Sequence, residues 1–401
     1  MNEKKIIYIS GTPLSKIQSE KLNIPWFLSQ GIETEYWDLT NIYYSKKALD
    51  LYFSGHPDFH KNNFPVQRVF SNIKSVKSAL NEVSTNTVFC NLDGFNLSPF
   101  WLLRVFKRNN LHYYIGPWRT IQPNQINTKS FLVKLFAAMI DGTLVKKILK
   151  LNSNNIFLFK LKLLIYRLTN YYQKPDFVIG MGSVGREQCR NIFAVNKFIS
   201  IRSNDANWKK LPNLINQKYC VYIDESIIYS PDTGLKFATK NNSTSSNFEK
   251  FKINLCHAFD IVEEKLGIKV IISCSGKYKY EDENLFGSRE MFYGKTNQLI
   301  QHSELVLGHA SSGVYQSIID KKPLILLNDP TFEKNKKSCI PILAEWLNVK
   351  CIWTTDFSSK NLEYLDNNSS HFTKLEGQYF ADKDAVDEYQ LVVAKHFGFN
   401  N

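Results

Sequence analysis

The chain has 401 residues, a length at which soluble proteins usually divide into two domains of about 200 residues each. Hydrophobic residues make up 43% of the chain and charged residues 22%, which is ordinary for a folded protein and excludes wholesale disorder. The formal net charge of +13 indicates an anionic partner: a nucleic acid, an anionic membrane surface or an anionic small substrate. The sequence contains no nucleic-acid-binding motif, so we expect no nucleic acid partner.

The seven cysteines are an odd number, are scattered along the chain and form no Cys-x-x-Cys pair. This arrangement is typical of reduced cysteines in a cytoplasmic protein and predicts no metal site. The sequence has no run of about 18 apolar residues, and its first nine residues are too poor in apolar side chains for a signal peptide. We therefore expect a cytoplasmic protein that does not span a membrane.

Segments typical of strands and helices alternate in the first half, which predicts a parallel, doubly wound α/β sheet. The first strand is expected over residues 5–9, and its helix over residues 14–30. The remaining strands are expected over residues 32–38, 66–70, 87–92, 112–115, 175–182 and 198–201. The remaining helices are expected over residues 73–83, 99–109 and 187–193, the last preceded by a Gly/Ser loop over residues 182–185.

Two acids in this half follow predicted strands, at the edge where open α/β sheets bind ligands. Asp93, in Asn91-Leu-Asp-Gly94, is the first candidate for a general base that removes a proton from an acceptor hydroxyl. An ordinary Asp-Gly turn is the alternative at that position. Asp38 is the second candidate for the base.

The second half continues the alternation, with a strand over 219–225 and a long helix over 248–266. From Glu304 to Leu327 the sequence predicts strand, Gly/Ser loop, helix, Lys-Pro turn and strand. A Gly/Ser loop that leads into a helix offers backbone N–H groups and the positive end of the helix dipole, which suit a phosphate or carboxylate. The alternative is that Ser311 or Ser312 simply caps the helix.

Together with residues 265–273, Phe286-Gly-Ser-Arg289 and residues 295–303, this stretch resembles the C-terminal half of bacterial surface-carbohydrate glycosyltransferases with the GT-B architecture. The resemblance covers roughly residues 218–330 and includes a Gly-Arg pair, a Thr-x-x-Leu-hydrophobic-x-x-Ser pattern, His-x-Ser-Ser and Lys-Pro. The chain departs from the family pattern after the strand at 270–272. Many relatives carry His-Pro there, whereas this chain has Ser273-Cys-Ser-Gly276.

The resemblance implies an α/β fold of two Rossmann-like doubly wound domains that face a cleft. Residues 1–213 would form the acceptor-side domain and residues 214–380 the nucleotide-sugar domain, and residues 381–401 would form a helix that crosses back to the first domain. The implied activity moves a sugar from a nucleotide-sugar donor to a lipid-linked or oligosaccharide acceptor in capsule or lipopolysaccharide assembly. It would need no metal ion and no other cofactor.

The resemblance also implies which residues carry this chemistry. Glu225, at the end of a predicted strand, joins Asp93 and Asp38 as a catalytic candidate. His309 either contacts the donor or packs at the strand end and bonds to the backbone. The residues expected at the donor are Ser273, Lys277, Arg289, His309, Ser311, Ser312 and Gly313.

Two alternatives remain open. A nucleotide-sugar epimerase or a polyol-phosphate transferase would share the fold. A non-catalytic carbohydrate-binding or assembly protein would account for the absent His-Pro pair.

Residues 131–174 combine apolar stretches with many lysines. Such a composition predicts an amphipathic surface in peripheral contact with the anionic inner face of the cytoplasmic membrane. The alternative is that the apolar side chains pack on the first domain and the lysines are solvated.

Overall fold

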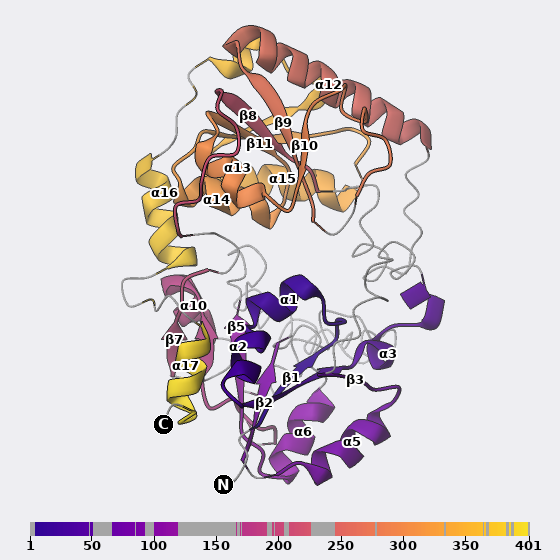
Figure 1. Ribbon diagram of the computed structural model, residues 1–401, viewed down its shortest axis with the longest axis vertical. Helices are drawn as coiled ribbons and strands as arrows, with labels where there is room; N and C mark the ends of the chain where they lie inside the picture. Colours follow the sequence, from indigo (N-terminus) through magenta and orange to yellow (C-terminus); the bar gives the residue numbers. More distant parts are fainter. Residues whose placement is uncertain are drawn as a thin grey trace, which may run out of the picture. The chain divides into compact units, whose positions relative to one another are not determined.

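The computed structural model divides the chain into two compact units (Figure 1). One comprises Met1–Tyr43, Phe64–Arg202 and Gln378–Asn401, and the other comprises Tyr44–Asn63 and Ser203–Gly377. The structure describes residues 5–47, 49–50, 66–84, 86–92, 100–118, 166, 169, 171–190, 195, 197–203, 208–225, 245–276, 279–332, 334–363, 365, 369–381, 385 and 389–399.

The first unit contains a sheet of seven parallel strands in the order β3-β2-β1-β4-β5-β6-β7. The chain order reverses between β1 and β4, and this is the topological switch point at which open α/β sheets bind ligands. The strands are β1 (Lys5–Ser10), β2 (Glu33–Asp38), β3 (Gln67–Val69), β4 (Thr87–Asn91), β5 (Tyr113–Trp118), β6 (Val178–Gly180) and β7 (Phe198–Ser200).

Helices cover both faces of this sheet because alternate residues of β1 point to opposite sides. Ile7 and Ile9 pack in one core with α5 (Ile73–Glu82) and α6 (Phe100–Arg108). Ile6 and Tyr8 pack in a second core with α2 (Ile24–Ser29) and α17 (Tyr389–His396). The other helices of this unit are α1 (Lys16–Lys21), α3 (Thr40–Tyr43) and α10 (Gly182–Gln188).

Two predicted segments of this unit differ from the structure. The helix expected over residues 14–30 is two helices, because Asn23 adopts a left-handed conformation with φ 51° and Pro25 follows at the start of α2. The loop expected over residues 182–185 is instead the first turn of α10. Gly182, with φ +64°, allows this turn to approach the backbone of Gln378.

The second unit contains a sheet of six parallel strands in the order β10-β9-β8-β11-β12-β13, with its switch point between β8 and β11. The strands are β8 (Tyr219–Ile223), β9 (Lys269–Cys274), β10 (Met291–Tyr293), β11 (Leu305–Gly308), β12 (Leu324–Asn328) and β13 (Lys350–Trp353). The helices are α12 (Ser245–Leu266), α13 (Thr296–His302), α14 (Tyr315–Ile319), α15 (Lys334–Leu347) and α16 (Ser369–Leu375). Short helical turns of this unit are η4 (Ser312–Val314), η5 (Thr354–Asp356) and η6 (Ser359–Leu362). The π-helical η7 (Glu376–Phe380) spans the boundary, and its residues from Gln378 onward belong to the first unit.

The second unit begins earlier than the sequence suggests, at Ser203. Side chains of α13 hold the segment that precedes β8: Gln301 accepts from Leu211 N at 2.9 Å, and Gln298 donates to Pro212 O at 2.7 Å. His302 Nε2 also lies 2.7 Å from Leu211 O. Because these bonds tie residues 211–212 to α13, this segment belongs with the second sheet.

The C-terminal helix α17 lies on the first sheet. Tyr389 and Tyr114 share a buried hydrogen bond of 2.8 Å between their hydroxyl groups, and Asn23 donates to Gln390 Oε1 at 2.7 Å. The chain therefore returns to the first unit, and the boundary falls between Gly377 and Gln378. Of the helices that the structure describes, none combines the length and the apolar character needed to cross a membrane.

Candidate functional site

The carboxyl ends of β8 and β11 lie side by side, because the two strands pair in register with Leu307 opposite Tyr222. Asp224 and Glu225 follow β8, and His309 follows β11. The third neighbouring strand, β9, ends with Ser273 and Cys274. This edge therefore brings the strand-end residues of three segments together at the switch point, the position at which open α/β sheets bind ligands.

The loop after β11 turns tightly into η4. Ser311 is the N-cap of η4, and its hydroxyl oxygen accepts a 3.2 Å hydrogen bond from Gly313 N. A Cβ added to Gly313 would lie 3.2 Å from the Ile223 side chain and 3.3 Å from that of Thr296, so this loop packs directly on β8 and α13. Ser312 is exposed, and the structure gives its hydroxyl no hydrogen bond to another described residue.

Ser273 is fully buried at the end of β9 and does not reach solvent. Its hydroxyl donates to Thr296 Oγ1 at 2.8 Å, which fastens β9 to the first residue of α13. Ser273 therefore supports the edge from below, and the structure does not place its hydroxyl where a donor phosphate could bind it. The expected contact of Ser273 with the donor stays a prediction that this placement does not support.

A tyrosine and an aspartate that we did not select from the sequence join two segments of this edge. Tyr280 donates its hydroxyl hydrogen to Asp224 Oδ2 at 2.7 Å, and its backbone N–H donates to the hydroxyl of Tyr293 at 3.1 Å. Both Asp224 and Tyr280 are buried, whereas Glu225 is partly exposed. The pair of acids at the end of β8 was the available signal, but the sequence does not show which of the two turns inward.

His309 is a packing residue. It is 0% exposed, its Nδ1 lies 2.6 Å from Leu327 O, and its Nε2 lies 2.8 Å from the hydroxyl of Tyr222. Its ring also contacts the rings of Phe251 and Phe332. Because both ring nitrogens are engaged inside the protein, the structure favours the packing role of His309 over a contact with a donor phosphate.

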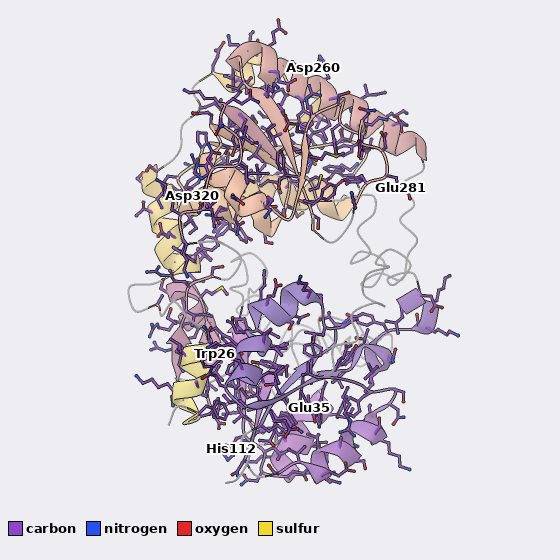
Figure 2. All side chains as sticks on the ribbon, in the orientation of Figure 1. Trp26, Glu35, His112, Asp260, Glu281 and Asp320 are labelled. Atoms are coloured by element: carbon purple, nitrogen blue, oxygen red, sulfur yellow. The ribbon has the colours of Figure 1, made fainter. Side chains whose placement is uncertain are left out.

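Arg289 also lies elsewhere. Its side chain is only 8% exposed, and its guanidinium pairs with Asp260 at 2.6 Å and with Glu263 at 2.5 Å, both on α12 (Figure 2 labels Asp260). These two acids raise the pKa of Arg289, although burial opposes them. Arg289 precedes β10 and so lies at the amino end of that strand, away from the carboxyl ends of the sheet. Arg289 is thus engaged with α12, and its expected contact with the donor stays a prediction that this placement does not support.

In the first unit, the Asp38 carboxylate is also buried and hydrogen-bonded to other residues of the protein. Its Oδ1 accepts from both the backbone N–H and the hydroxyl of Thr40, and its Oδ2 accepts from Gln67 at 3.0 Å. Burial raises the pKa of Asp38, while these bonds oppose the rise. Asp38 is 3% exposed and caps the turn into α3, so the structure gives its carboxylate no access to a substrate hydroxyl.

Two other candidates, Asp93 and Lys277, lie outside the described residues, as does most of the segment 131–174. Among the residues that the structure does describe, no group of three or more His, Cys, Asp or Glu side chains is placed to hold a metal ion.

Comparison with known proteins gives matches to solved structures only. No protein-family model and no curated protein sequence matches this chain. The structure of CalG4, the calicheamicin glycosyltransferase, aligns with a TM-score of 0.50 at 10% identity, over 100% of this chain and 98% of that chain. A variant of the wall teichoic acid polymerase TagF aligns with a TM-score of 0.50 at 11% identity, over 98% of this chain and 88% of that chain. The chain has the GT-B fold.

A structure of UDP-N-acetylglucosamine 2-epimerase also aligns over 100% of this chain, at 10% identity and a TM-score of 0.46. The strand order of both sheets and the alignments with CalG4 and TagF confirm the expected fold of two Rossmann-like sheets.

Proposed function

We propose that the chain is a glycosyltransferase that binds a nucleotide-sugar donor at the carboxyl edge of its second sheet. The observation that carries the proposal is the exposed Ser312, held on a tight turn beside the ends of β8 and β11 at the switch point. The fold supports it, because the similar solved structures include a calicheamicin glycosyltransferase and a wall teichoic acid polymerase.

In glycosyl transfer, the residues at this edge would stabilise the phosphate group that leaves the sugar. When the bond between the sugar and the diphosphate breaks, its electron pair and the negative charge pass to the phosphate oxygen. The exposed Ser312 hydroxyl can donate a hydrogen bond to that oxygen, which is the kind of preorganised stabilisation that lowers a transition state. Lys277 would add a positive charge, and no metal ion or other cofactor is required.

The acceptor hydroxyl must lose a proton as it forms the new bond to the sugar, so a carboxylate base is needed. Glu225 is the described candidate, because it is partly exposed at the end of β8, whereas Asp38 is buried. Asp93, after β4, is the candidate from the first unit.

We further propose an oligosaccharide or lipid-linked acceptor, and a role in bacterial surface polysaccharide assembly on the cytoplasmic side of the membrane. The support is the net charge of +13 together with the lysine-rich composition of residues 131–174. Co-sedimentation with anionic vesicles tests the membrane contact. Binding should fall with added salt and when Lys146, Lys147 and Lys150 are changed to glutamate; full recovery in the supernatant would contradict it.

A panel of nucleotides in a thermal-shift experiment tests the donor site. A ligand that binds only the folded chain stabilises it in proportion to the logarithm of its concentration over Kd, so the responding member of UDP, GDP, CMP and dTDP identifies the donor class. Ser312→Ala should weaken that response. Ser359→Ala removes an exposed serine from the matching first position of η6 in the same unit and should leave the response unchanged.

The same panel, extended with CDP-glycerol, also distinguishes the alternative functions. A response to UDP accompanied by epimerisation of the free nucleotide sugar would favour an epimerase, and a response to CDP-glycerol would favour polyol-phosphate transfer. A chain that responds to no nucleotide would be a non-catalytic carbohydrate-binding or assembly protein.

A further inference from the structure

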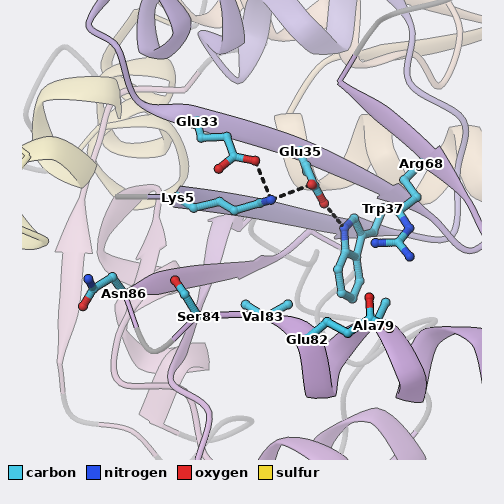
Figure 3. A pocket seen from close by; sticks show the side chains of 10 residues that line it. All are labelled: Lys5, Glu33, Glu35, Trp37, Arg68, Ala79, Glu82, Val83, Ser84 and Asn86. Atoms are coloured by element: carbon cyan, nitrogen blue, oxygen red, sulfur yellow. Dashed lines mark hydrogen bonds and ion pairs between the residues drawn. The ribbon is translucent and has the colours of Figure 1, made fainter. Parts of the chain in front are cut away.

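A cavity of about 530 Å³ opens at the amino ends of the strands in the first sheet, at the edge opposite to the switch point. The charged side chains of its wall come from three strands and one helix (Figure 3). They are Lys5 at the start of β1, Glu33 and Glu35 on β2, Arg68 on β3 and Glu82 at the end of α5. Its volume lies within the range of about 300–1,000 Å³ that is usual for small-molecule sites.

The charges occupy positions that the sheet normally fills with apolar side chains. Lys5 lies on the same face of β1 as Ile7 and Ile9, which pack in the core beneath α5 and α6. On β2, Glu33 and Glu35 share that face with the buried Trp37. The layer between the sheet and α5 is therefore apolar around Ile7 and Ile9. Between Trp37, which lines the cavity, and the amino ends of the strands, the layer is polar and contains the cavity.

Hydrogen bonds fix the floor of this cavity. Lys5 Nζ lies 2.6 Å from Glu33 Oε1 and 2.5 Å from Glu35 Oε1, and Trp37 donates its indole N–H to Glu35 Oε2 at 2.6 Å. Figure 3 shows these bonds as one continuous chain from Glu33 to Trp37. Glu35 is thus fully engaged, whereas Glu33 uses one oxygen, and its side chain is 50% exposed.

The remaining groups offer both donors and acceptors. The guanidinium of Arg68 lies over the rings of Trp37 and Phe70, at 5.8 and 5.0 Å from their centroids, and has no ion pair with another described residue. Glu33 and the exposed Glu82 can accept hydrogen bonds, and Ser84 and Asn86 add neutral polar groups. The wall is therefore rich in hydrogen-bonding groups of both kinds.

The charged side chains that line the cavity limit the chemical class of ligand that it can bind. An anion would meet three carboxylates, a cation would meet Lys5 and Arg68, and an apolar molecule would desolvate all five charged groups without replacing their hydrogen bonds. A sugar avoids all three costs, because its hydroxyls donate to carboxylates and accept from a guanidinium. We propose that this cavity binds a neutral saccharide, as a second carbohydrate site that is separate from the donor site and does not depend on it.

The indole N–H of Trp37 provides a local reporter, because its partner Glu35 lines the cavity. In a chain with tryptophans labelled with ¹⁵N, titration with methyl glucoside and N-acetylglucosamine should shift the Trp37 indole signal in a saturable way, with a Kd in the millimolar range. The indole of Trp208, which donates to Ser203 O in the other unit, should not move.

Variants locate the binding. The double change Glu33→Gln and Glu82→Gln should weaken saccharide binding about tenfold, since a hydrogen bond to a charged group is stronger than one to a neutral group. Glu20→Gln, an exposed change on α1 of the same unit, should have no effect. Ser312→Ala should also leave the titration unchanged, which keeps this test independent of the donor site.

Three results would overturn the proposal. The Trp37 signal could remain fixed with every neutral sugar, it could shift equally in the Glu33/Glu82 variant, or it could respond only to glucuronate, in which case Arg68 would be an anion site.

Discussion

Tyr280 donates its hydroxyl hydrogen to Asp224 Oδ2 across 2.7 Å, and this bond ties the segment after β9 to the carboxyl end of β8. Asp224 and Tyr280 are 7% and 8% exposed, so the bond is nearly shielded from water. It connects two of the segments that form the proposed donor edge, although neither residue needs to touch the donor.

We therefore expect Tyr280→Phe to lower the free energy of unfolding by about 1–3 kcal/mol, the cost of leaving a buried acceptor without its donor. Tyr280→Phe should also weaken nucleotide binding, because the segment after β9 would no longer be hydrogen-bonded to Asp224 beside the proposed donor site. Urea unfolding and nucleotide titration measure the two effects.

Tyr219→Phe is the matched control. Tyr219, at the other end of β8, donates its hydroxyl hydrogen to Leu299 O at 2.7 Å. The Tyr219→Phe substitution should therefore lower the free energy of unfolding by a similar amount and leave nucleotide affinity unchanged. Equal affinities in the Tyr280 and Tyr219 variants would show that the bond to Asp224 is structural only.

His309→Phe should destabilise the second unit without removing donor affinity from the molecules that remain folded. The substitution keeps an aromatic ring in the cluster, but Leu327 O loses the donor that lies 2.6 Å away, at a cost of about 1–3 kcal/mol. Ser312→Ala, three residues further along the loop, is exposed and should change the free energy of unfolding by no more than about 0.5 kcal/mol. A normally stable His309→Phe protein that no longer binds nucleotide would restore His309 as a donor contact.

Gly182→Ala should be severely destabilising. A Cβ at this position would overlap the backbone carbonyl of Gln378, and the residue also has φ +64°. Gly31→Ala isolates the second effect, because Gly31 has φ +71° with no atom within 4 Å of the added carbon. We expect about 1–2 kcal/mol for Gly31→Ala and a clearly larger loss for Gly182→Ala in urea unfolding. Similar losses in the two variants would contradict the close approach between α10 and η7.

The raised pKa of Asp38 gives a prediction for pH. The folded chain holds the Asp38 proton more tightly than the unfolded chain, so this contribution to stability is fully present below the unfolded pKa of about 3.9. It is lost as the pH rises through the higher folded pKa. Asp38→Asn cannot titrate, so the stability of the variant relative to the natural chain should increase between acidic and neutral pH. A relative stability that falls over that interval would contradict the raised pKa.

Most strands could be predicted from the sequence, because apolar runs bounded by turns report burial directly. The strand β10 was not predicted because its apolar run is only Met291-Phe-Tyr293, whereas the equally short β6 and β7 lie within longer apolar runs. The bonds from Gln298 and Gln301 to residues 209–212 join segments about 90 residues apart, so the sequence alone does not show that residues 209–212 belong with the second sheet.

The contacts of the candidate site residues were also hard to predict, because their partners lie far away in the sequence. The sequence placed His309 and Ser312 on one loop but could not show that His309 turns inward to Tyr222 while Ser312 faces solvent. Arg289 matched a motif, yet its partners Asp260 and Glu263 lie on a distant helix. Side-chain direction at a strand end depends on tertiary contacts, which residue spacing does not encode.

The central claim is that the turn beside the ends of β8 and β11 binds the phosphates of a nucleotide sugar. Isothermal titration of the responding nucleotide diphosphate into the natural chain and into the Ser311→Ala/Ser312→Ala double variant tests it most directly. Loss of charge-assisted hydrogen bonds worth about 1.5–3 kcal/mol should raise Kd by about 10–150-fold, while loss of the Ser311 cap should cost only about 1 kcal/mol of stability. An unchanged Kd in a destabilised double variant would mean that these serines only cap η4, and that the phosphates bind elsewhere.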